Sequence, residues 1–265
     1  MRLDKFLAEA SIGTKKVTRN YVKEGKVTVN NRIILNPAVE IEENLDVIRY
    51  LGQEVTHTGN IYYMFHKPAG CITARQDNCC KTVLDYFDVE IRNRLFPVGR
   101  LDKDTEGLLL LTNDGEFNHN LMHPDKHVEK TYFFWAFGSL DINDIKRLKA
   151  GINIGEGETL AIATKLEVTV EGLYQELKDK MNAVTIKDVN KNPNTQRVVS
   201  GYITIAEGRK HQIKRMLKAV GCYVAYLKRV SIGALMLDNS LKPGQYRELT
   251  EKEISILENN SDENI

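Results

Sequence analysis

The sequence has no long hydrophobic run. Its longest aliphatic stretch is the run of four leucines at 108–111, far short of the roughly 20 apolar residues that a membrane-spanning helix requires. The first ten residues, MRLDKFLAEA, carry charges where a secretory signal peptide has its apolar core. We therefore expect a chain that enters neither a membrane nor the secretory pathway.

Cysteine is scarce and shows no paired spacing. The four cysteines are Cys71, Cys79, Cys80 and Cys222, with no CxxC pair among them. Two adjacent cysteines cannot readily bridge each other. Both features argue against a disulfide framework and favour a reduced, cytoplasmic protein.

Motifs for metals and nucleotide cofactors are missing as well. His119 and His123 have a spacing that can suit a metal on a helix, but no glutamate completes an HExxH pattern and no third ligand is evident. There is no Walker-type loop and no dinucleotide-binding fingerprint. We expect neither a metal nor a cofactor.

A net charge of one sign is absent overall but present locally. Lys and Arg (37) almost balance Asp and Glu (36), which leaves a formal charge of +1. Residues 1–35 nevertheless hold eight basic and three acidic side chains, a balance of +5, and residues 36–60 reverse the sign. Such a reversal marks a domain boundary or a linker. A basic segment suits nucleic acid, although an ordinary solvated helix face explains it about equally well.

The basic segment has its own periodicity. Apolar residues at 3, 6, 7 and 10 fall on one helical face, and Thr14 can cap a second helix after a break. The stretch KVTVNNRII then alternates around Asn30 and Asn31, which is a hairpin signal. The pattern predicts a basic helix pair followed by a hairpin.

Residues 61–255 contain more predicted strands than helices. IYYMFHKP, GLLLLT, KTYFFWAF and VSGYITIAEG are typical of strands, and HQIKRMLKAVG is typical of a helix that ends at Gly221. Strands and helices do not alternate as they do in a doubly wound fold. We therefore predict an α+β fold with a mostly antiparallel or mixed sheet and flanking helices.

The stretch GRLDKDTEGLLLLTNDG (99–115) concentrates charge directly before a buried strand. Asp102 stands on the connecting segment, where a scaffold can hold a catalytic group open to a cleft. Arg100, Asp102 and Asp104 would share one side of an extended segment. A simple pairing of Asp102 with Arg100 explains the pattern as well. Paired carboxylates also occur in glycosidases, but groups this close in sequence rarely straddle a sugar.

The stretch GRKHQIKRM (208–216) is the second candidate. Lys210, Lys214 and Lys218 would fall on one helical stripe, and Arg209 and Arg215 flank it. A helix start also offers free backbone N–H groups. Such a surface suits the phosphates of a polyanion, and a plain solvated face is the weaker explanation.

Tyr132, in EKTYFFWAF, is the third candidate. Aromatic strand residues usually belong to the core, as we expect for Phe133, Phe134 and Trp135. Tyr132 differs from them only in following Lys130 and Thr131, so by itself it is a weak signal.

Together these motifs resemble those of the RsuA-like bacterial ribosomal RNA pseudouridine synthases, over nearly the whole chain. MRLDKFLAEASIGTKKVTRNYVKEGKVTVNN is similar to an S4 RNA-binding domain. HKPAG (66–70) resembles the family's first motif, which usually has Asn in place of His66. GRLDKDTEGLLLLTNDG resembles the catalytic motif, EKTY the tyrosine motif, EGRKHQIKRM the last motif, and RVSIGALMLDNSLKPGQYRELTEKE the carboxyl-terminal segment.

The resemblance implies a role for each matching residue. It implies that Asp102 is the catalytic aspartate, Tyr132 the residue that packs on the target base, and Lys214 the basic partner of Asp102. It implies isomerisation of a uridine to pseudouridine without cofactor or metal. The implied RNA-binding residues are Arg100, Arg2, Lys5, Lys15, Lys16, Arg19, Lys67, Arg209, Lys210 and Arg215.

The resemblance also divides the chain. It implies an S4-like RNA-binding domain at 1–50, a linker at 51–60, a pseudouridine synthase catalytic domain at 61–255 and a flexible tail at 256–265. The expected partner is ribosomal RNA, closest to the small-subunit (16S) case, in a subunit assembly intermediate, with a monomeric enzyme in the cytoplasm. The alternatives are a large-subunit (23S) substrate and a non-catalytic RNA-binding or ribosome-assembly protein.

Overall fold

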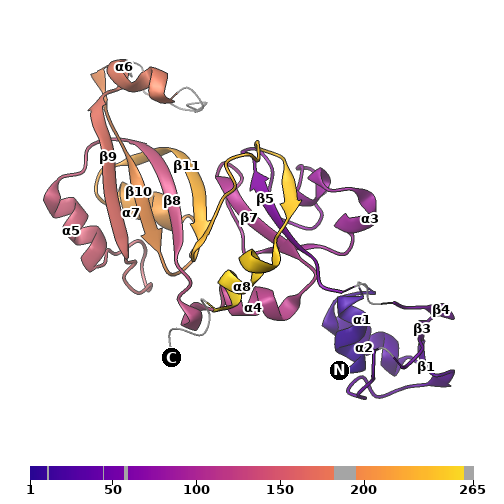
Figure 1. Cartoon of the computed structure of the whole chain (residues 1–265). Coiled ribbons are helices and arrows are strands. Elements are labelled where there is room, and N and C mark those ends of the chain that lie inside the picture. The colour runs from indigo at the N-terminus through magenta and orange to yellow at the C-terminus, as the bar shows by residue number, and fades with distance from the viewer. Residues whose placement is uncertain (11, 44, 57–58, 182–194, 260–265) are drawn as a thin grey trace.

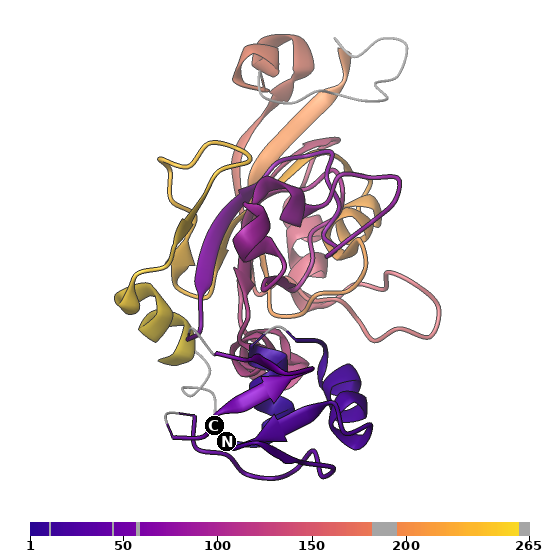
Figure 2. The same ribbon diagram turned by 90° about the vertical axis from the view of Figure 1, so that its right-hand side faces the viewer.

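The computed structural model describes residues 1–265 except 11, 44, 57–58, 182–194 and 260–265. Figure 1 shows a small amino-terminal domain, drawn in indigo, next to a larger domain built on a long sheet. The turned view in Figure 2 shows the small domain at one end of the larger one. The basic segment at the start of the chain therefore folds within a unit of its own.

The amino-terminal domain is a helix pair packed on a small sheet. Thr14 caps the second helix, because its Oγ accepts a hydrogen bond from Val17 N at 3.4 Å. Asn30 and Asn31 have φ values of 50° and 66°, which a tight hairpin turn requires. Both sequence predictions are confirmed. The elements are α1 (Leu3–Glu9), α2 (Lys15–Lys23), β1 (Val27–Val29), β2 (Arg32–Ile33), β3 (Ile48–Tyr50) and β4 (Gln53–Glu54), with strand order β2-β1-β3-β4.

The boundary of this domain lies further along the chain than residue 50. β4 (Gln53–Glu54) pairs with β3, so part of the predicted linker at 51–60 is a strand of the small sheet. Val55 is buried in the core of the same domain. The charge reversal in the sequence could not show this, because an exposed edge strand is as polar as a linker.

The larger domain contains a mixed sheet, as predicted. Among the described residues its path is β13-β5-β7-β11-β8-β10-β9, with β12 paired to β11 and β6 to β7. All pairs are antiparallel except β7 with β11. The strands are β5 (Tyr62–Lys67), β6 (Phe96–Val98), β7 (Glu106–Thr112), β8 (Lys130–Phe137), β9 (Lys165–Leu173), β10 (Arg197–Ile205), β11 (Tyr223–Ile232), β12 (Leu235–Met236) and β13 (Tyr246–Glu248). The helices are η1 (Val83–Tyr86), α3 (Val89–Arg92), α4 (Gly115–Met122), η2 (Pro124–Lys126), α5 (Ile142–Ala150), α6 (Tyr174–Leu177), η3 (Lys178–Met181), α7 (Gln212–Lys218) and α8 (Glu251–Asn259).

Strand β7 is apolar on both faces because it separates two cores. Leu109 and Leu111 point into one core, to which α5 and α7 contribute. Leu108 and Leu110 point into the other, to which α4 and α8 contribute. Alternate side chains of a strand point to opposite faces, so a strand between two cores needs a continuous leucine run.

The carboxyl-terminal helix corrects the predicted tail. Residues 256–259 belong to α8, and Leu257 is fully buried against α4 and its neighbours. Figure 1 shows α8 beside α4. The rest of the predicted tail, 260–265, lies outside the described residues. In the described part of the chain, no helix has the length and apolar character that crossing a bilayer requires.

The parallel contact of β7 with β11 depends on glycine at position 107. Gly107 has a φ of 106°, and a Cβ there would lie 2.1 Å from the carbonyl oxygen of Arg229 and 2.7 Å from its nitrogen. Both atoms are backbone, so neither can move without separating the strands.

We expect Gly107→Ala to lower the free energy of unfolding by about 3 kcal/mol or more, because backbone strain and steric overlap add. Urea denaturation measures this. Gly115→Ala is the control, since no heavy atom lies within 4 Å of a Cβ there, and it should change stability by less than about 0.5 kcal/mol. Equal stability of the two variants would contradict the requirement for glycine at position 107.

Candidate active site

The segment between β6 and β7 holds Asp102. Thr73 Oγ donates to the carbonyl oxygen of Leu101 at 2.8 Å and accepts from its N–H at 3.1 Å. Thr105 N donates to the carbonyl oxygen of Asp102 at 3.1 Å, which closes a turn just before β7. Leu101 is buried, whereas the Asp102 side chain is 28% exposed. The backbone is thus fixed on both sides of a carboxylate that stays accessible.

Lys67, at the end of β5, supports this segment from inside. Its side chain is fully buried, and its Nζ donates to the carbonyl oxygens of Pro68, Lys103 and Thr105 at 3.0, 3.4 and 2.9 Å. Burial lowers the pKa of Lys67, and the nearby thiol and carboxylates act in the opposite direction. The prediction that Lys67 binds RNA is wrong in this structure, because its donors are all used by the main chain.

Charged groups from two segments meet around Asp102. Lys214 Nζ, on α7, lies 3.4 Å from Asp102 Oδ2 and 2.5 Å from Asp104 Oδ1. Partial desolvation acts to raise the pKa of Asp104, but the hydrogen bond and charge of Lys214 outweigh it, so the pKa of that carboxyl is lowered. The resemblance implied that Lys214 is the partner of Asp102; the structure adds that Asp104 shares the ammonium and contacts it more closely.

His211 is a neighbour of Asp102 that the sequence analysis did not single out. Its Nε2 lies 3.5 Å from Asp102 Oδ1, and its side chain is half exposed. It precedes α7 in a left-handed conformation, with a φ of 52°. The sequence signal was its place in GRKHQIKRM, but a left-handed turn cannot be read from a helical stripe.

A small cavity of about 70 Å³ opens beside the carboxylate of Asp102. Tyr132, in β8, lines it and is 8% exposed. Ile205 of β10, Ile213 of α7 and Leu227 of β11 supply apolar walls, and none of these three was a sequence candidate. Arg100 is exposed at the rim. One charged side and several apolar sides suit a flat, uncharged ring held next to a carboxylate.

Comparison with known proteins identifies the family. Residues 61–219 match the family model for RNA pseudouridylate synthase, and residues 1–47 match the S4 domain. An uncharacterized RNA pseudouridine synthase of Bacillus subtilis (strain 168) is 41% identical over 97% of this chain and 98% of its own length. The chain belongs to the RNA pseudouridylate synthase family.

Further relatives agree with this result. A ribosomal small subunit pseudouridine synthase A of Vibrio vulnificus is 34% identical over 96% of this chain and 98% of its own. A ribosomal large subunit pseudouridine synthase B of Bacillus subtilis is 35% identical over 97% of this chain and 95% of its own length. A crystal structure of a pseudouridylate synthase superposes with a TM-score of 0.62 at 31% identity. The match covers 97% of this chain and 99% of the chain in that structure. This protein is therefore an RNA pseudouridine synthase, an isomerase.

Two arginines that were expected to bind RNA instead brace the synthase's active-site helix. Arg209 donates to the carbonyl oxygen of Thr159 and forms ion pairs with Glu207 and Glu158 at 2.7 and 3.6 Å. Arg215 Nε donates to the carbonyl oxygen of Ile154 at 2.8 Å, and its guanidinium pairs with Glu158 at 2.5 Å. Arg215 therefore fastens α7, and Arg209 the turn before it, to the loop at 154–160.

The predicted stripe of three lysines is shorter than expected. Helix α7 begins at Gln212, so Lys210 lies in the turn before it and not on the same stripe as Lys214. Lys210 and Lys218 are exposed. Of the basic residues in this motif, Lys210 therefore keeps the accessible position that RNA binding requires.

Lys5, one of the five predicted RNA-binding cations of the S4 domain, forms ion pairs with Glu9 and Glu116, and the other four fall into two groups. Arg2 and Arg19 both donate to the buried carboxylate of Asp4, at 3.0 and 2.7 Å, which outweighs desolvation and lowers the pKa of that carboxyl. Lys15 and Lys16 are exposed at the start of α2, and neither forms an ion pair within the described residues. The two lysines are therefore exposed to solvent, whereas the two arginines form ion pairs with Asp4.

His66 stands where the resembling motif usually has Asn. It is 4% exposed, and its Nδ1 contacts the carbonyl oxygen of Leu241 at 2.7 Å, while its Nε2 has no hydrogen-bond partner among the described residues. Burial lowers the pKa of His66, Leu241 opposes this, and the charges of Lys228 and Glu106 act in opposite directions. The imidazole is therefore a neutral core side chain.

The neutral state of His66 predicts a pH dependence of stability. In the unfolded chain the imidazole takes up a proton near pH 6.5, whereas the folded state resists it. The stabilising contribution is present above that pH and is lost as the pH falls, by up to about 1.4 kcal/mol per pH unit. Urea denaturation from pH 7.5 to 5.5 should show a shallower fall for His66→Asn than for the wild type; identical slopes would contradict this account.

We expect Lys67→Met to lower the free energy of unfolding by about 2 kcal/mol, because three main-chain carbonyls lose their donor. The rate of pseudouridine formation should fall as the Asp102 segment loosens, while RNA affinity changes little. Lys81→Met, at an exposed lysine over the ring of Tyr86, is the control. Weaker RNA binding with unchanged stability of Lys67→Met would restore the sequence prediction.

Proposed function

We propose that this synthase isomerises one specific uridine of small-subunit (16S) ribosomal RNA to pseudouridine, with Asp102 as the catalytic carboxylate. The observation that carries the proposal is the Asp102 carboxylate at the rim of a cavity that Tyr132 and Leu227 line. Lys214 lies 3.4 Å from it. The relatives named above include one small-subunit and one large-subunit synthase at similar identity, so the choice of subunit rests on the MRLDKF start and the lysine of HQIKRM.

This set of residues meets most of the chemical requirements of the reaction. The C1′–N1 bond of uridine breaks, the base turns, a C1′–C5 bond forms, and a proton leaves C5 while N1 gains one, so atoms and electrons balance without a co-reactant. Asp102 would either attack C1′ or assist formation of a glycal. Lys214 would offset the negative charge of Asp102 throughout.

The cavity walls would hold the loosened base. Tyr132 would pack on the uracil ring, a contact that suits an unpaired base, and Leu227 and Ile213 would exclude water from it. A uridine in a helix would have to be flipped out to enter. Arg100, at the rim, would hold a phosphate or occupy the vacated stack.

The setting of the reaction is part of the same proposal. Basic residues of the S4 domain, Lys15 and Lys16 among them, would bind the RNA backbone. We place the enzyme in the cytoplasm as a monomer that acts on ribosomal RNA within a subunit assembly intermediate. A large-subunit (23S) substrate is the second candidate. The ribosomal large subunit pseudouridine synthase B of Bacillus subtilis, one of the relatives named above, favours it.

Mapping of pseudouridine in unmodified small-subunit and large-subunit ribosomal RNA tests the proposal. We expect one new site in small-subunit RNA with the wild type, and a loss of roughly 10³-fold or more in rate with Asp102→Asn. The Asp102→Asn variant should bind RNA as well as the wild type, or more tightly, since it lacks one negative charge.

Asp125→Asn, at a carboxylate that is 88% exposed, is the matched control and should leave the rate unchanged. A pseudouridine found only in large-subunit RNA would show that the substrate is large-subunit and not small-subunit RNA. Full activity of Asp102→Asn would remove Asp102 from the chemistry.

A further inference from the structure

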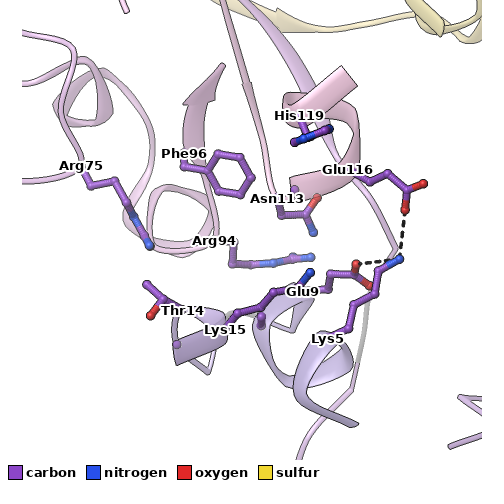
Figure 3. Close-up of a pocket in the computed structure, with 13 residues that line it drawn as sticks. Lys5, Glu9, Thr14, Lys15, Arg75, Arg94, Phe96, Asn113, Glu116 and His119 are labelled. Carbon is purple, nitrogen blue, oxygen red and sulfur yellow. Dashed lines mark hydrogen bonds and ion pairs between the residues drawn. The ribbon is translucent and has the colours of Figure 1, made fainter. Parts of the chain in front are cut away.

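A groove of about 540 Å³ lies between the S4 domain and the synthase domain, away from the Asp102 cavity. Lys5 and Lys15 enter it from α1 and α2, and Arg75, Arg94, Phe96 and His119 line it from the synthase domain (Figure 3). Its volume falls within the usual range of about 300–1,000 Å³ for ligand sites. None of the family's motifs identified above includes Arg75, Arg94, Phe96 or His119.

The charges of the wall leave the groove basic. Its two carboxylates, Glu9 and Glu116, both face Lys5, at 3.7 and 3.2 Å from its Nζ. Lys5 therefore forms an ion pair across the two domains and offsets one of the groove's two negative charges. Lys15, Arg75 and Arg94 add three positive charges, so the wall carries four cations against two carboxylates.

Flat side chains accompany these cations. Phe96, in β6, is only partly buried, and Figure 3 shows its ring on the groove wall between Arg75 and His119. Arg94 extends across the groove below that ring. Alternation of cations with a partly exposed aromatic ring is an arrangement that binds unpaired nucleic acid, through phosphates and base stacking.

The groove is connected to the active site by the same segments that hold Asp102. Thr73 is hydrogen-bonded to Leu101, and Arg75 follows it two residues later. Arg75 Nη2 donates to the carbonyl oxygen of Asn93 at 2.9 Å, next to Arg94. From Phe96 to Asp102 the chain covers at most roughly 20 Å, the length of an extended segment of six residues, and a few nucleotides can span that distance.

We propose that this interdomain groove binds the unpaired RNA strand that flanks the target uridine, with Arg75, Arg94 and Lys15 on its phosphates and Phe96 stacked on one base. The inference rests on the proposed function, since it takes RNA as the substrate. It deepens that function by assigning a second binding site to residues that both domains contribute. The S4 domain would then act by completing this groove as well as by its own surface.

Binding of a fluorescent ten-nucleotide oligouridylate tests the groove, measured with full-length protein that carries Asp102→Asn so that no turnover occurs. The double variant Arg75→Gln/Arg94→Gln should weaken the Kd roughly 10-fold at 0.1 M salt. It should also reduce the slope of log Kd against log salt by about 1.4, because two single-strand phosphate contacts are lost. The matched control is Lys146→Gln/Lys149→Gln, which removes the same charge from exposed positions of α5 at the far end of the molecule.

Phe96→Leu keeps the charge and most of the volume. It should weaken binding roughly 5-fold or more without changing the salt slope, and it decides the matter if the double arginine variant unfolds. Equal Kd and slope for groove variants and control would overturn the proposal, as would uridine monophosphate that competes as tightly as the strand. Oligouridylate binding is measured independently of pseudouridine formation, so failure of the proposed function and failure of the groove give different results.

Discussion

The parallel contact of β7 with β11 is the constraint on which the rest of this synthase depends. Gly107 lies so close to Arg229 that no Cβ fits, and Arg229 Nε donates to the carbonyl oxygen of Leu108 at 2.7 Å across the same junction. On one side of the junction, β5, β6 and β7 position Asp102. On the other side, β8, β10, β11 and α7 carry Tyr132 and the remaining cavity walls. The active site exists because two halves of one sheet meet here at backbone contact distance.

Burial divides the many cations of this chain into two kinds. A cation in water is available to a phosphate, whereas a cation in the interior must satisfy its donors with carbonyl or carboxylate oxygens. Lys67 and Arg229 are fully buried and bind main-chain oxygens, although Arg229 Nη2 has no hydrogen-bond partner among the described residues. Burial, with a smaller effect of Arg229, lowers the pKa of Lys130 to about 8. Arg209 and Arg215 use carboxylates and carbonyls to fasten one loop. Many of the cations in the motifs therefore stabilise the active-site segments, and only the exposed cations are accessible to RNA.

The sheet also sets the distance between chemistry and RNA binding. Strand β6 runs antiparallel to β7, from Phe96 opposite Thr112 to Val98 opposite Leu110, and the chain then turns toward Asp102. The proposed groove and the cavity thus lie at the two ends of the segment from Phe96 to Asp102. Lys5, by pairing with Glu116 of α4, holds the S4 domain at the groove end. A surface ion pair of this kind contributes little stability, so bound RNA itself would add to the fixation of the two domains.

The sequence by itself determined the types of the elements that it predicted, the α+β class and the family, because periodicity, capping residues and ordered motifs are local properties of the chain. It also placed Asp102 before a buried strand and Lys214 on a helix, and the family resemblance paired the two. Only the tertiary structure decided that His211 reaches Asp102, that Leu227 and Ile205 close the cavity, and that Lys67 turns inward. These are contacts between segments far apart in the chain, and whether a lysine faces water or a main-chain carbonyl depends on what the rest of the fold packs around it.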